Sequence, residues 1–184
     1  MMTKQTKFIL AIVLQVVIIL AIILFKLSIL AGGTQVLLQI EPVDPRNPLR
    51  GDYIAFQYAI SNINPSFFDD PRIKNGDFVY VGLRQTGKYW VAKRVYKSRP
   101  PDGEIFIKGK VLNGTVQPQD DVFSFDRFSG SRVQIVYGIE EYFIPEGTGQ
   151  GFSFAGKEVS AGVVVDEDGN PVLKQIYIDG KRWP

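Results

Sequence analysis

The apolar residues of the chain are gathered into one long stretch near its beginning. From Phe8 to Phe25 there is no charged residue, Gln15 is the one strongly polar side chain, and a further apolar stretch follows Lys26 up to Ala31. About 20 apolar residues are enough to cross the roughly 30 Å hydrocarbon core of a bilayer. A buried core helix would carry a polar face, and this stretch has none. The pattern therefore predicts one transmembrane helix over residues 8–31.

Residues 34–184 show a different pattern, in which short runs of strand-forming residues alternate with turns. Residues 34–41 predict a first strand, and the prolines at 42, 45 and 48 prevent continuous pairing after it. Many short strands without a soluble helix are typical of a single all-β domain, either a barrel or a sandwich. Further strands are predicted at 50–58, from residue 75 onward, and at 87–97, 104–112, 132–144 (with a bend at Gly138), 161–165 and 172–178.

The most firmly specified strand follows the turn residues Gly51 and Asp52. Alternation along this strand places Phe56 and Tyr58 on one face, together with Ile54 and Ile60. We expect that face to lie in the core, with Asp52 bonded to the amides of its own turn and the Tyr58 phenol bonded to a polar partner. The main interpretation of this stretch is therefore structural.

The opposite face of the same strand supplies candidate contact residues. Tyr53 shares this face with small and polar neighbours, an arrangement that can form a shallow recognition surface. Arg50 precedes the turn and adds a charge beside it. Phe67 and Phe68 lie in a loop rich in Asn, Pro and Asp, where they either fold back on the core or contact lipid or a partner.

The spacing Gly51-Asp52-Tyr53-x-x-Phe56-x-Tyr58 resembles that of bacterial membrane-anchored proteins called GDYXXLXY after this motif. Phe56 stands where that family usually has Leu. The stretch 137–147, Tyr-Gly-Ile-Glu-Glu-Tyr-Phe-Ile-Pro-Glu-Gly, also resembles the family, so the resemblance covers most of the β domain. It implies a membrane anchor and brings no established activity.

Composition excludes several classes of function. The chain has no cysteine and no histidine, which excludes zinc sites, a lipid-modified cysteine and hydrolysis by a Ser-His or Cys-His pair. Three of the 21 basic residues precede residue 34, which leaves 18 basic against 19 acidic residues in the β domain. Such a balance does not suit a nucleic-acid surface. We expect no metal and no cofactor.

Lys93 is the candidate base for the one enzymatic alternative. The order of a membrane span, two Gly-Asp turns and Lys93-Arg94-Val95 is similar to type I signal peptidases, which use a serine nucleophile and a lysine base. The resemblance implies a serine just before the first Gly-Asp, and no serine occurs between Thr34 and Tyr58. A lysine base without a hydroxyl to deprotonate catalyses no acyl transfer. We therefore expect an exposed strand lysine, with a divergent Ser/Lys peptidase as an alternative.

Charges around the apolar stretch predict its orientation. Lys4 and Lys7 precede it and no acidic residue does, which favours a cytoplasmic tail at residues 1–7 and an extracytoplasmic domain at residues 34–184 of a plasma-membrane protein. The alternative is a signal peptide cleaved near the small residues at 31–33. We expect a non-enzymatic accessory or interaction module whose partners are membrane lipid and other membrane proteins. A self-assembling structural subunit is the second possibility.

Overall fold

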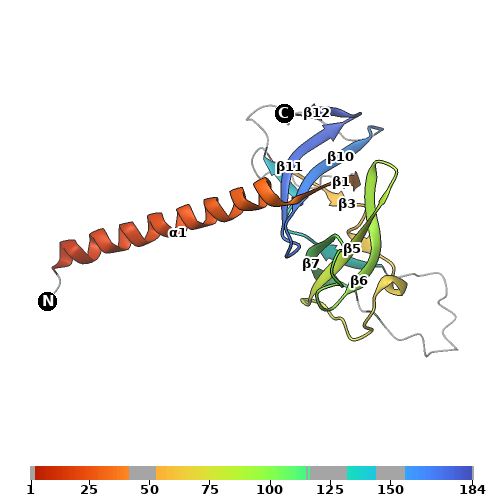
Figure 1. The fold of residues 1–184 in the computed structure, drawn as a ribbon, viewed down its shortest axis with the longest axis horizontal. Helices are drawn as coiled ribbons and strands as arrows, with labels where there is room; N and C mark the ends of the chain where they lie inside the picture. Colours follow the sequence, from red (N-terminus) through yellow and green to blue (C-terminus); the bar gives the residue numbers. More distant parts are fainter. Residues whose placement is uncertain (1–2, 42–52, 115, 117–131, 144–155, 184) are drawn as a thin grey trace.

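A computed structural model describes residues 3–41, 53–114, 116, 132–143 and 156–183. The apolar stretch forms one helix, α1 (Lys4–Gly32), which extends away from the β domain (Figure 1). The Thr3 hydroxyl caps its start by accepting a hydrogen bond from the Thr6 amide at 3.3 Å. From Phe8 to Leu27 its large apolar side chains are 46–68% exposed, so the fold itself leaves them uncovered. The helix contains the predicted range 8–31 and begins one turn earlier.

The first β-sheet starts directly where the helix ends, because Gly33 alone separates α1 from β1 (Thr34–Glu41). Neighbouring strands of this sheet are antiparallel and their order is β12-β11-β10-β1-β3. The other four strands are β3 (Gln57–Tyr58), β10 (Val159–Val165), β11 (Pro171–Ile178) and β12 (Lys181–Trp183).

The second sheet is also antiparallel, in the order β4-β8-β7-β5-β6. A separate two-stranded ribbon pairs β2 with β9, and one 3-10 turn, η1 (Pro65–Phe67), follows β4. These strands are β2 (Tyr53–Ala55), β4 (Asn62–Ile63), β5 (Phe78–Thr86), β6 (Tyr89–Tyr96), β7 (Phe106–Asn113), β8 (Val133–Val136) and β9 (Glu141–Phe143).

Buried side chains from both sheets form one hydrophobic core. Alternation explains which residues enter it: Val36, Leu38 and Ile40 of β1 are buried, and Gln35 and Gln39, which point to the other face, are exposed. Neither five-stranded sheet closes on itself, so the fold is sandwich-like rather than a barrel. The predicted all-β class is confirmed, and the sandwich is the form observed.

Two predicted strands differ in detail from the observed ones. The strand predicted over 50–58 is interrupted at Phe56, because β2 pairs with β9 whereas β3 pairs with β1. The strand expected from residue 75 begins at Phe78, since Gly76 (φ +88°) and Asp77 belong to the preceding turn. The bend at Gly138 is confirmed: its φ is +75°, and it lies between β8 and β9. The short strands β4 and β12 were not predicted.

Candidate functional site

The two stretches that carry the sequence signature lie side by side in the structure. β2 and β9 pair in antiparallel register, with Ile54 opposite Tyr142 and Ala55 opposite Glu141. Just beyond this ribbon, the Phe56 amide donates a hydrogen bond to the Glu140 carbonyl at 3.0 Å. Segments about 85 residues apart in the chain therefore form one structural unit.

Two buried tyrosines lock this unit by reciprocal hydrogen bonds. The Tyr58 hydroxyl donates to the Ile139 carbonyl at 2.7 Å, and the Tyr137 hydroxyl donates to the Ile60 carbonyl at 2.6 Å. The two rings meet edge to face with centroids 6.3 Å apart. Burial raises the pKa of both phenols well above the ordinary tyrosine value, and the nearby charge of Glu140 raises it further. Both hydroxyls therefore remain neutral donors.

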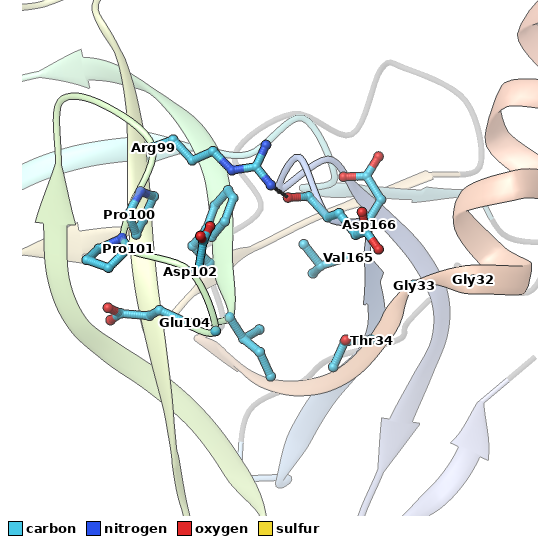
Figure 2. A pocket seen from close by; sticks show the side chains of 14 residues that line it. Gly32, Gly33, Thr34, Arg99, Pro100, Pro101, Asp102, Glu104, Val165 and Asp166 are labelled. Carbon is cyan, nitrogen blue, oxygen red and sulfur yellow. Dashed lines mark hydrogen bonds between the residues drawn. The ribbon is translucent and has the colours of Figure 1, made fainter.

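A cleft of about 300 Å³ lies where α1 enters the β domain (Figure 2). One wall is the helix–strand junction at residues 32–34, another is the loop that precedes β7, and the third is the end of β10. Its polar lining is mostly acidic, with Arg99 as the one cation. The acidic residues are Asp102, Glu104, Asp166 and Glu167.

Arg99 connects the loop before β7 to the β10–β11 hairpin across this cleft. Its guanidinium donates to Asp168 Oδ1 at 3.0 Å and to the Glu167 carbonyl at 2.9 Å, and it lies 5.7 Å from the centroid of the Phe106 ring. The hairpin also docks directly on β7, because the Lys108 amide donates to the Gly169 carbonyl at 2.8 Å. The cation of the cleft is therefore already used in joining the two sheets.

Comparison with protein families tests whether the chain belongs to the family that its motif resembles. The GDYXXLXY protein family matches residues 15–176, from within α1 to β11. The chain belongs to the GDYXXLXY family. Searches of curated proteins and of solved structures returned no match. The family name describes the motif, so a role for this chain has to be argued from its own residues.

The structure places only part of the GDYXXLXY motif. Phe56 and Tyr58 are buried, and their rings meet edge to face with centroids 5.5 Å apart. Tyr53 is placed by its backbone in β2. Arg50, Gly51 and Asp52 lie outside the described residues. The candidate contacts at Arg50 and Tyr53 therefore stay predictions.

The predicted aromatic pair of the GDYXXLXY chain divides between core and surface. Phe68 is half-buried, packs against the core and forms an isolated parallel bridge with Val95. Phe67 belongs to η1 and is 39% exposed. Of the two alternatives left open by the sequence, folding back on the core applies to Phe68, and Phe67 remains available for contact.

Lys93 lies at the outer surface of β6. Its side chain is 53% exposed, and its Nζ lies 3.3 Å from Oε1 of Glu104. A bulge in the β5–β6 pairing makes Lys93 an extra residue, so Ala92 before it and Val95 after it both pack against the core. Within the described part of the chain, no serine or threonine hydroxyl is hydrogen-bonded to Lys93. The arrangement gives the peptidase alternative no support.

The acidic turn between β10 and β11 is held by hydrogen bonds among its own residues. Asp166 Oδ1 accepts hydrogen bonds from the amides of Asp168 at 2.9 Å and Asn170 at 2.7 Å. Among the described residues, no group of three or more His, Cys, Asp or Glu side chains is arranged to hold a metal ion. These carboxylates shape a turn that places Gly169 on β7.

One surface was missed by sequence reasoning. Phe78 is 61% exposed and Leu112 is 50% exposed, on neighbouring strands of the second sheet. The ammonium groups of Lys108 and Lys110 lie 5.3 and 5.9 Å from the centroid of the Phe78 ring. We call these four residues the Phe78 surface. The signal was present in the sequence, because Phe78 alternates with the core residue Val79 and must therefore point outward.

Proposed function

We propose that this chain is a single-pass membrane protein whose extracytoplasmic β domain is a non-enzymatic interaction module. The observation that supports the anchor is the exposure of α1: a 29-residue apolar helix has no cover from its own domain. Exposed apolar surface of this extent is stable in lipid and not in water. Lys4 and Lys7 favour retention of the N-terminal side of the helix in the cytoplasm.

The short junction keeps the β domain at the membrane surface. Lys26 marks the end of the uncharged run, and the six residues from there to Gly32 rise about 9 Å as helix. The headgroup layer on one side of a bilayer is roughly 5–8 Å thick. Because Gly33 alone follows before β1, the proposed anchor would put the cleft at the outer edge of the headgroup layer.

The role assigned to the β domain follows from how its groups are used. The buried motif tyrosines hold the fold, Arg99 joins the two sheets, and Lys93 is paired with a carboxylate. Among the described residues of the β domain, the exposed large apolar side chains are Phe67 and the Phe78 and Leu112 of the Phe78 surface. Aromatic side chains beside lysines are well suited to a partner with aromatic and acidic groups. Arg50 and Tyr53 are further candidate contacts.

Anchoring is tested on the full-length protein in its native membranes. We expect the protein to stay in the pellet after extraction at alkaline pH, with residues 8–31 present in intact-mass measurement. Release of a shortened product that lacks this segment would show a cleaved signal peptide and overturn the proposed anchor.

Interaction is tested by cross-linking in membranes followed by identification of the conjugates. We expect Phe78→Ser combined with Leu112→Ser to lose defined conjugates that the wild type forms. Arg84→Ser, an exposed position on the same β5 strand, is the matched control and should keep them. An identical conjugate pattern for all three proteins, with unchanged folding by circular dichroism, would remove the Phe78 surface from the proposal.

A further inference from the structure

Gln15 is the polar residue at the centre of the apolar helix. Its side chain is exposed on α1, and among the described residues its amide has no hydrogen-bond partner. Ser28, the other uncharged polar side chain between Phe8 and Gly32, is satisfied within the helix because its hydroxyl donates to the Phe25 carbonyl at 2.8 Å. The Gln15 amide makes no such hydrogen bond within the helix.

Its position in the span prevents the amide from reaching water. Gln15 lies eight residues after Lys7 and eleven before Lys26, which correspond to about 12 and 16 Å along a helix. A glutamine side chain is several ångströms too short to bridge either distance, unlike the lysines at the two ends. An amide without a partner in hydrocarbon costs several kcal/mol. A protein partner is therefore needed at this depth.

We infer that Gln15 mediates a parallel dimer of α1 with a second copy of this chain. This inference rests on the proposed membrane anchor. A carboxamide carries both a donor and an acceptor, so it is complementary to itself. All copies of a single-pass protein insert in one orientation, which places Gln15 of each copy at the same depth. Two copies can then satisfy both amides with no other partner, and hydrogen bonds of this kind hold helices together in membranes.

The helical repeat defines the face involved. At 100° per residue, Ala11 and Ile22 lie within about 40° of Gln15, whereas Leu24 lies on the opposite side. Ala11 is small, so it lets the two helix backbones approach closely next to the amide. The proposed contact face is therefore centred on Gln15 and includes Phe8, Ala11, Ile19 and Ile22.

The absence of cysteine makes this face directly testable by oxidative cross-linking of the full-length protein in membranes. We expect Ile22→Cys to form disulfide-linked dimers, and Leu24→Cys, at nearly the same depth on the opposite side, to form several-fold fewer. Adding Gln15→Leu to Ile22→Cys should lower the dimer yield by roughly three- to fifteen-fold. Gln15→Asn keeps a carboxamide and should retain most of the yield.

Each result of these experiments supports or overturns the proposed dimer. Equal yields from Ile22→Cys and Leu24→Cys, or a yield that Gln15→Leu leaves unchanged, would overturn the dimer. Dimers lost together with retention at alkaline pH would overturn the anchor as well, so retention is measured on the same samples. A Gln15-dependent conjugate with a different protein, without self-cross-linking, would assign the amide to that partner and reject the second copy.

Discussion

At the scale of single residues, the motif tyrosine acts through its hydroxyl as well as its ring. Tyr58 and Tyr137 each cap a backbone carbonyl on the other's segment, so the signature stretches share two hydrogen bonds deep in the core. A buried carbonyl that loses its donor suffers the full desolvation penalty. This explains why a tyrosine, rather than a phenylalanine of similar bulk, suits position 58.

Tyr58→Phe should lower the free energy of unfolding by about 1–3 kcal/mol, because the Ile139 carbonyl is left without a donor. Urea denaturation followed by tryptophan fluorescence measures the change. Tyr80→Phe is the control: its half-buried ring lies on the outer face of β5, and its effect should be within about 0.5 kcal/mol. Equal losses for both variants would mean that the Tyr58 hydroxyl contributes nothing.

The raised pKa values of Tyr58 and Tyr137 predict a loss of stability in alkali. Above pH 10.0, the ordinary tyrosine value, the unfolded chain releases these protons while the folded protein keeps them. The unfolded state then binds fewer protons, so stability falls as pH rises, by up to about 1.4 kcal/mol per pH unit for each tyrosine.

Unfolding free energies between pH 9 and 11 measure this slope. Replacing both tyrosines by phenylalanine should give a less stable protein whose stability depends less steeply on pH. The same slope in the double variant would assign the alkaline loss to other groups.

At the scale of elements, the β10–β11 hairpin joins the two sheets through a glycine. Gly169 has a φ of +81°, and a Cβ at this position would lie 2.7 Å from a carbon of the Phe106 ring. Gly87, in the β5–β6 turn, has a φ of +62° but open space around it. Gly169 is restricted by backbone conformation and by packing, whereas Gly87 is restricted by conformation alone.

Gly169→Ala should therefore destabilise the protein by about 1–3 kcal/mol more than Gly87→Ala, because only the former overpacks the contact with β7. Urea denaturation of both variants gives the comparison. Phe106→Leu in the Gly169→Ala background should recover part of the loss by making space. If the two glycine variants cost the same, the hairpin does not dock tightly on β7.

Strands with a clear alternation could be predicted from the sequence, and their partners could not. The bounds 34–41 of β1 were predicted correctly, because its run of strand-forming residues ends at Pro42. The interruption at Phe56 and the bulge at Lys93 depend on which strands lie alongside, and no local pattern encodes that choice. β4 and β12 have two and three residues, too few to show a period.

The candidate site, too, could be predicted from the sequence only in part. The inward position of Phe56 and Tyr58 follows from alternation, whereas the bond from Tyr58 to Ile139 joins residues 81 positions apart. Both stretches, 50–58 and 137–147, resemble one family. This resemblance related them to each other but did not predict how they pair. The Phe78 surface required a contact between β5 and β7 that only the folded chain provides.

At the scale of the whole molecule, α1 and β1 are nearly continuous, so in the proposed anchor the orientation of the helix fixes the side of the membrane on which the β domain lies. Two lysines precede the apolar run, and Lys26 alone lies at its far end. Positive charge near the ends of a span is retained on the cytoplasmic side, and Arg46 and Arg50 also follow the helix within about 20 residues, so the balance between the two sides is narrow. Orientation should therefore be sensitive to Lys4 and Lys7.

Single cysteines at exposed positions report this orientation, because the chain has none of its own. In intact cells or spheroplasts, a membrane-impermeant maleimide should label Lys181→Cys and reach Thr3→Cys only after permeabilisation. Removing both charges with Lys4→Gln and Lys7→Gln should give a mixed population, with Thr3→Cys partly labelled from outside. Labelling of Thr3→Cys in intact cells with both lysines present would place the β domain in the cytoplasm and exclude an extracytoplasmic role for the Phe78 surface.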